Sequence, residues 1–291
     1  MNADGHHFMQ ERSFPTAENS WVEKFRPVQE GALLEDYRGR KGNILVIAPH
    51  PDDDVLGAGG TMAAASDQGK GIFSVYITDG GGSPRKNRSI SDEAMATRRE
   101  REALSALRAV GAVGGFFLKR RSEELAGELG RPTEEELTEI LQFIQPEEVF
   151  VPAPYERHRT HQRCTRISID ALRTAGNREM TLLGYSLWGS FWGEKRRVVR
   201  DISPFIKKKV EAVLAHASQV DYKSYQQGIL GKNNYEAIFW EAHEPQKTSF
   251  AEIFLDMTEL LEKKDLTLES FIRQDLEAFI QAFLQISTYS D

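Results

Sequence analysis

The sequence is poor in cysteine, in long apolar runs and in positive charge. Its 291 residues include one cysteine, Cys164, which excludes an intrachain disulfide and fits a reducing compartment. No apolar run reaches the length of a membrane span, and the first residues lack the apolar core of a secretion signal. The formal net charge of -7 argues against general nucleic-acid binding, because phosphate contacts need a basic surface. We therefore expect a cytoplasmic protein with no integral membrane segment and no nucleic-acid partner.

From residue 43 onward, short apolar segments alternate with segments of helical period. The alternation predicts parallel crossovers, and therefore an α/β fold with a Rossmann-like, mostly parallel sheet covered by helices on both faces. The strand-like segments are "NILVIAP", "GIFSVYITD", "GGFFLK" and "EEVFVPAP". The helices expected with them span 57–69, 91–111 and 133–144, and a fourth begins near His161.

Two of these helices carry end signals. Ser91 is placed to cap the second helix, and Gly111 is placed to end it. Thr133 and Glu136 have the spacing of a capping box, directly behind Pro132. These signals predict helix starts at residues 91 and 133.

The ends of the chain predict additions to the central domain. Residues 1–42 show no clear period and are expected to form an N-terminal extension, while residues 43–255 form the main domain. Residues 256–291 are expected to be a helical segment packed on it. Within the C-terminal α+β extension we expect strands near 182–190, 195–202 and 250–257, and helices over 203–219 and 225–244.

The first strand runs directly into a histidine and three aspartates, "PHPDDD", with His50 at its start. Bunched carboxylates repel each other and are costly to bury unless a cation lies among them. In a parallel sheet, ligands bind at the carboxyl ends of the strands. The segments "TDGGGS" and "PAPYERHRTH" are predicted to end at the same edge. A metal site at this edge explains the cluster better than a solvated turn.

The second histidine-rich segment supplies further ligands. His158 and His161 are three residues apart and share a face in a helix or tight turn. Together with His50 and Asp53 they give four candidate ligands. Two imidazoles, one carboxylate and an open water position suit catalytic Zn²⁺, and Fe²⁺ or Mn²⁺ also fit. One histidine is then free for another role.

Other motifs are less informative. The glycines of "GAGG" lack the third glycine of a dinucleotide fingerprint, whose position Met62 occupies. Cys164 is expected in the core, and Trp188 and Trp192 are expected to pack more often than to stack on a ligand. The remaining N-terminal and C-terminal histidines, His6, His7 and His243, are expected to be surface or structural residues.

The sequence resembles the LmbE-like or PIG-L-like N-acetylglucosaminyl deacetylases over residues 43 to 255. The family's first motif, (A/P)HPDDE, appears as Pro49-His50-Pro51-Asp52-Asp53-Asp54, and its second, H-x-D-H, as His158-Arg159-Thr160-His161. Further matches to the family are Thr78-Asp79-Gly80, Arg99 with Glu102, His216 with Gln219, and Glu252.

The resemblance implies a role for each motif residue. His50, Asp53 and His161 would hold the metal, and Asp52 would be the general base. His158 would stabilise the oxyanion or protonate the leaving amine. Arg99 would contact the substrate, and a solvated charge on the helix is the equally weighted alternative for it.

Two positions depart from the family pattern. Asp54 replaces the usual glutamate and is one methylene shorter, so any contact that it makes must be rearranged. Thr160 replaces the usual aspartate between the two histidines and carries no charge. The proposed ligands and base are intact, so catalysis is still expected.

The expected function is that of a zinc-dependent N-deacetylase acting on an N-acetyl amino sugar, of the GlcNAc type, in a glycoconjugate or metabolite. An amidase acting on another acyl group or on a thiol-conjugate amide is the alternative within the same chemistry. A non-catalytic sugar-binding module of the same fold is the alternative from another class, and Thr160 is its support. The sequence is compatible with a homo-oligomer.

Overall fold

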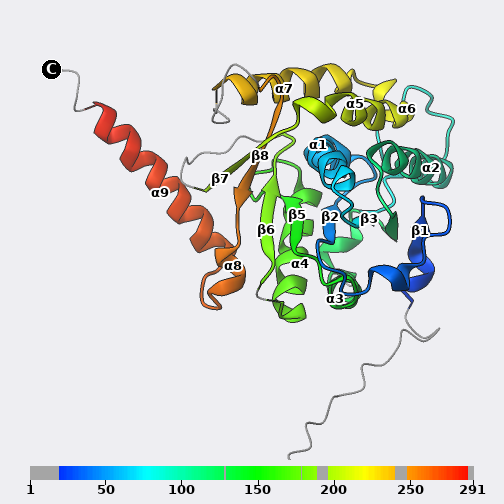
Figure 1. Ribbon diagram of the computed structural model, residues 1–291, viewed down its shortest axis with the longest axis horizontal. Coiled ribbons are helices and arrows are strands. Elements are labelled where there is room, and N and C mark those ends of the chain that lie inside the picture. Colours follow the sequence, from blue (N-terminus) through cyan, green and yellow to red (C-terminus); the bar gives the residue numbers. More distant parts are fainter. Residues whose placement is uncertain (1–19, 128, 178, 189–195, 240–247, 288–291) are drawn as a thin grey trace, which may run out of the picture.

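A computed structural model describes residues 20–127, 129–177, 179–188, 196–239 and 248–287. Its centre is an eight-stranded sheet with the order β1-β4-β3-β2-β5-β6-β8-β7. Helices pack around this sheet (Figure 1). Its five middle strands are parallel to one another, which confirms the mostly parallel α/β fold. These parallel strands are β4 (Gly114–Arg120), β3 (Ile72–Thr78), β2 (Ile44–Ala48), β5 (Glu148–Pro152) and β6 (Thr181–Tyr185).

Antiparallel strands extend the sheet at both edges. β1 (Phe25–Pro27) pairs with β4, so part of the expected N-terminal extension belongs to the sheet. Trp21, shortly before β1, is buried, and its ring centroid lies 5.3 Å from that of Phe143. At the other edge, β8 (Ala251–Asp256) lies between β6 and β7 (Arg197–Asp201).

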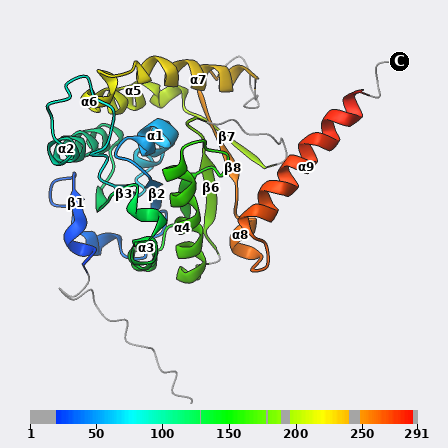
Figure 2. The same cartoon turned by 180° about the vertical axis from the view of Figure 1, so that it is seen from behind.

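Helices cover both faces of the sheet (Figures 1 and 2). In β2, Ile44, Val46 and Ala48 pack on one face, and Leu45 and Ile47 on the other, and all five are buried. A strand buried on both faces is a continuous apolar run, as the sequence shows. The first face carries α1 (Asp53–Asp67), α2 (Asp92–Val110) and α5 (Ile206–Ala215), and the second carries α3 (Gly130–Ile144) and α4 (Arg159–Ala175).

One predicted helix start is confirmed and one is wrong. The Ser91 side chain accepts a hydrogen bond from the backbone N–H of Ala94, and Gly111 ends α2 with φ +75°. In contrast, α3 begins at Gly130, and the Thr133 hydroxyl donates back to the carbonyl of Leu129. Glu136 pairs with Lys24 and Arg120 instead of closing a capping box. Pro132 lies in the first turn, where a helix tolerates it.

The C-terminal part is more broken than expected. The helix predicted over 203–219 is interrupted at His216, where α5 gives way to α6 (Ala217–Val220). Tyr185 ends β6, and the rest of the predicted strand at 182–190 is irregular or outside the described residues. The other helical elements are η1 (Val22–Lys24), η2 (Leu34–Tyr37), η3 (Glu124–Ala126), η4 (Ser203–Phe205), α7 (Tyr225–Phe239), α8 (Glu259–Glu262) and α9 (Leu268–Ser287).

The last helix packs on the domain through its first turns. Leu268 and Phe271 are buried, whereas Phe279 and Leu284 are exposed where α9 extends away from the body (Figure 1). None of the helices that the structure describes is long and apolar enough to cross a membrane.

Candidate metal centre and active site

The site lies where the strand order of the parallel sheet reverses. β2 and β5 are neighbours, and the chain leaves their carboxyl ends for α1 on one face and α4 on the other. Such a switch point leaves a crevice between the two loops. His50 follows β2, and His158 and His161 follow β5, so the predicted edge does bring the two motifs together. They line a pocket of about 710 Å³.

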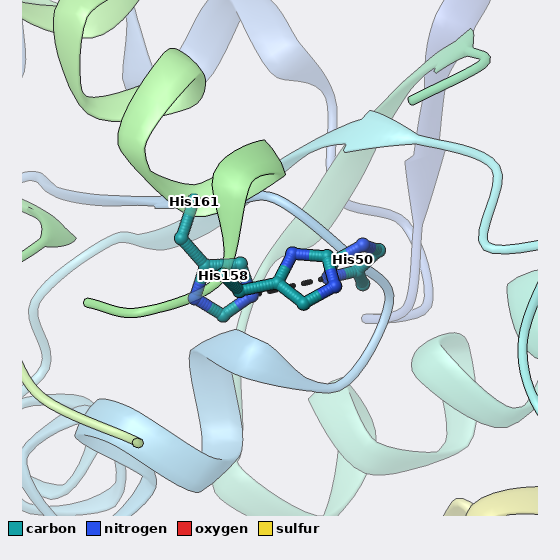
Figure 3. A group of neighbouring side chains, drawn as sticks. All are labelled: His50, His158 and His161. Carbon is teal, nitrogen blue, oxygen red and sulfur yellow. Dashed lines mark hydrogen bonds between the residues drawn. The ribbon is translucent and has the colours of Figure 1, made fainter. Parts of the chain in front are cut away.

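Three predicted ligand atoms converge at the base of this pocket. Asp53 Oδ2 lies 2.9 Å from His50 Nδ1 and 3.2 Å from His161 Nε2. The two imidazole nitrogens are 3.3 Å apart (Figure 3). Asp53 and His161 are buried. Two imidazole nitrogens and a carboxylate oxygen that face one another form a donor set that fits a divalent transition-metal ion.

The pKa shifts of Asp53 and His161 reflect the same cluster of side chains. Burial by itself raises the pKa of Asp53, but His161 and His50 hold it well below its usual value. Burial opposes the charge of His161, yet Asp53 and Glu156 raise the pKa of this imidazole to about 10. A negative carboxylate between two imidazoles is a site that stabilises added positive charge.

His158 offers a second possible ligand set. It is exposed at the start of α4, and its ring centroid lies 5.2 Å from that of His50 and 5.0 Å from that of His161. One nitrogen from each of the three histidines lies within 4.8 Å of the others (Figure 3). Burial, His50 and His161 lower the pKa of His158. The geometry therefore brings all four predicted ligands together, with His50 and His161 common to both sets.

Asp52 has a separate partner. Its Oδ1 lies 2.5 Å from Arg99 Nη2, and both side chains are buried. Arg99 also donates to the hydroxyl of Ser83 and lines the pocket. The alternative of a solvated helix charge for Arg99 is therefore wrong. Gly80 makes room for it, because a Cβ there would lie 2.5 Å from Arg99 Nη1, and its φ is +66°.

Asp54 faces away from the site and joins α1 to β3. It is fully buried and accepts hydrogen bonds from Ser74 Oγ at 2.7 Å and Tyr76 Oη at 2.6 Å. Burial raises the pKa of this carboxyl to about 6. Both hydroxyls donate to Oδ2 of this side chain, which is one methylene shorter than the glutamate of the resembled motif.

Glu156 belongs to the site and was not predicted from the sequence. It is buried, and its Oε2 lies 3.4 Å from His161 Nδ1, on the opposite side of the ring from Asp53. Its Oε1 accepts the backbone N–H groups of Leu187 and Trp188 at 2.5 and 3.1 Å. Thr160 supplies no carboxylate, and Glu156 supplies one behind His161. Its position two residues before His158 was the available signal.

The later motif residues mainly connect elements. Glu102 accepts the backbone N–H and hydroxyl of Ser218 at 2.9 and 2.6 Å, which joins α2 to α6. Glu252 accepts the N–H groups of Gly60 and Thr61, both at 2.8 Å, and pairs with the buried Lys209 at 2.6 Å.

Two further residues of these motifs lie near the site. His216 is buried, and burial lowers its pKa to about 4, while Gln219 lines the pocket. Four residues considered in the sequence, His6, His7, Trp192 and His243, lie outside the described residues.

Known proteins share both sequence and fold with this chain. Residues 45–172 match the PIG-L family, described as GlcNAc-PI de-N-acetylase. A diacetylchitobiose deacetylase of Thermococcus kodakarensis is 29% identical over 188 residues, which are 60% of this chain and 69% of that protein. A probable N-acetyl-alpha-D-glucosaminyl L-malate deacetylase 2 of Bacillus anthracis is 26% identical over 224 residues, 70% of this chain and 93% of that protein.

A solved structure agrees in fold. The N,N'-diacetylchitobiose deacetylase of Pyrococcus horikoshii, in complex with an inhibitor, superposes with a TM-score of 0.64 at 24% identity. The alignment covers 88% of this chain and 98% of that one. The two proteins therefore share a fold.

Proposed function

We propose that this chain, whose residues 45–172 form a PIG-L (LmbE-like) domain, is a metal-dependent hydrolase that removes the acetyl group from an N-acetyl amino sugar. The convergence of Asp53 Oδ2, His50 Nδ1 and His161 Nε2 within 3.3 Å of one another carries the proposal. The deacetylases among its relatives support the reaction and the amino-sugar substrate.

His50, Asp53 and His161 would hold the ion, and Zn²⁺ is our first choice, with Fe²⁺ or Mn²⁺ as alternatives. A bound divalent ion would polarise the amide carbonyl and lower the pKa of water toward about 7. Asp53 is preferred to His158 as the third ligand because it is buried between the two imidazoles, whereas His158 is exposed.

Asp52 would accept the proton of the attacking water. Arg99 binds Asp52 Oδ1, which orients the carboxylate and leaves Oδ2 for the proton transfer. Arg99 also lines the pocket, so a further contact with the substrate is part of the proposal.

His158 would stabilise the carbonyl oxygen as it gains charge, or protonate the leaving amine. Its exposure in the lining of the pocket supports this role, because the imidazole can reach a molecule bound there. Glu156 would orient His161 through Nδ1.

Acetate release tests the proposal. The purified protein is assayed with N-acetylglucosamine, diacetylchitobiose and N-acetylglucosaminyl malate, before and after chelation and after addition of each metal. We expect hydrolysis of at least one sugar, loss on chelation and recovery with one ion. A metal-loaded protein that hydrolyses no acetamide but binds sugars would favour the binding-module alternative, for which Thr160 is the supporting residue. Hydrolysis confined to other acyl or thiol-conjugate amides would favour the amidase.

We also propose a cytoplasmic location. Cys164 is the single cysteine and is buried, so the chain forms no intrachain disulfide, which fits a reducing compartment. The division of the chain at residues 42 and 255 remains a prediction, as does any homo-oligomer.

A further inference from the structure

Trp188 is an exposed aromatic side chain inside the candidate active-site pocket. Its exposed fraction is 46%, unusually large for an indole ring, and it lines the pocket together with His158 and His161. Tyr225, at the start of α7, also lines the pocket. The two rings meet nearly edge to face, with centroids 5.8 Å apart and an interplanar angle of 66°. Packing alone leaves much of the indole ring uncovered.

The buried Glu156 connects the backbone of Trp188 to the candidate metal centre. One carboxylate accepts the backbone N–H of Trp188 and lies 3.4 Å from Nδ1 of His161. A buried carboxylate with several donors has little freedom to move, because each lost hydrogen bond would leave a buried charge unsatisfied. The Trp188 backbone and the His161 ring are therefore held by the same group.

The chemistry of the pocket points to one kind of occupant for these rings. Most of its other described lining residues are charged, polar or glycine, among them Asp79, Arg121 and Lys223. A pyranose ring has a rim of hydroxyl groups and a face of C–H groups. Aromatic side chains with a polar edge suit such amphipathic ligands, and a few polar groups then set the orientation.

We propose that Trp188 and Tyr225 form an aromatic wall that binds the C–H face of a pyranose ring of the substrate. This inference rests on the proposed function and adds the subsite that holds the sugar. Trp188 supplies the larger exposed surface, and Tyr225 supports its edge. The proposal gives Trp188 a ligand-binding role beyond the packing role that the sequence favoured.

The test is calorimetric binding of the deacetylated disaccharide chitobiose, which has no acetyl group left to remove. It is measured for the wild type and for the Trp188→Ala, Trp188→Phe and Tyr235→Ala variants. Tyr235 is a matched control, because it is an exposed aromatic residue of α7 outside the described pocket lining. We expect Trp188→Ala to weaken binding about tenfold or more. Trp188→Phe should stay within about threefold of the wild-type affinity, because the phenyl ring, like the indole ring, offers a flat apolar face. Tyr235→Ala should leave binding unchanged.

Kinetics give a second readout. With an acetylated sugar that the wild type hydrolyses, Trp188→Ala should raise KM about tenfold while kcat changes less than about threefold, as expected for lost ground-state binding.

The outcomes separate the two proposals. Equal binding by the wild type and Trp188→Ala, equally weak binding by Trp188→Phe and Trp188→Ala, or no binding by the wild type would each overturn the aromatic wall. A wild type that binds chitobiose through Trp188 but releases no acetate from any sugar would support the wall and contradict the deacetylase.

Discussion

The two loops that build the site handle charge in opposite ways. After β2, the successive Asp52, Asp53 and Asp54 turn toward three different sets of partners: Arg99, the two imidazoles, and the hydroxyls of Ser74 and Tyr76. After β5, His158 and His161 turn toward the same point, where His50 also lies.

Helix geometry explains the difference. Consecutive residues at the start of a helix project about 100° apart, so the carboxylates at the start of α1 separate. Residues three apart lie on the same face, so the histidines at the start of α4 converge. The three adjacent aspartates therefore make separate contacts, whereas the two histidines three residues apart contribute to the same site.

Metal binding should show the largest effects of substitutions in the two loops. Asp53→Ala and His161→Ala should each reduce metal content from about one ion per chain to almost none, because three protein ligands are needed. His158→Ala should keep its metal, since His158 is assigned to the substrate side. Elemental analysis of dialysed protein measures all three variants. Metal retained in Asp53→Ala and lost in His158→Ala would instead identify the three-histidine set.

Asp52 tests whether neighbouring carboxylates have separate roles. Asp52→Ala should keep its metal but lower kcat by about 10²- to 10⁴-fold, the usual contribution of a general base. Metal content and acetate release are measured on the same sample. Wild-type turnover in this variant would show that Asp52 is not the base.

Glu156 tests the second loop. Glu156→Gln removes the charge behind His161 and should weaken metal affinity about 10- to 100-fold, the usual effect of losing a group that orients a ligand. Competition with a chelator of known affinity measures the change. Glu123→Gln is the matched control, because Glu123 is an exposed carboxylate that lines the same pocket. Equal affinities for both variants would leave Glu156 with a purely structural role.

Local sequence predicted the parts of the site that depend on local geometry. The buried run of β2, the following His50 and Asp53, and the spacing of the two later histidines are all properties of short segments. Because parallel strands end at a common edge, they were enough to predict that the candidate ligands lie close together. The Ser91 cap and the Gly111 stop of α2 are local in the same sense.

The features that the sequence did not predict, or left undecided, depend on distant contacts. Glu156 is satisfied by backbone groups of Leu187 and Trp188, which are 31 and 32 residues later in the chain. Arg99 is buried because it meets Asp52 across 47 residues. Local sequence shows that Glu156 is close to His158, but it does not show whether a loop glutamate or a helix arginine has such a partner or lies in solvent. The capping box at Thr133 failed for a related reason, since Glu136 pairs with Lys24 and Arg120 from other elements.

The smallest predicted effect comes from weakening the contacts of Asp54, which should lower the stability of the fold without changing metal binding. Tyr76→Phe removes one of the two hydroxyls that donate to the buried carboxylate of Asp54, which should lower the free energy of unfolding by about 1 to 3 kcal/mol. Urea unfolding measures this loss. Tyr235→Phe, which removes an exposed hydroxyl, should stay within about 0.5 kcal/mol of the wild type. If Tyr76→Phe instead lost its metal at full stability, the third aspartate would belong to the metal centre, and the separation of the three carboxylates would fail at its last member.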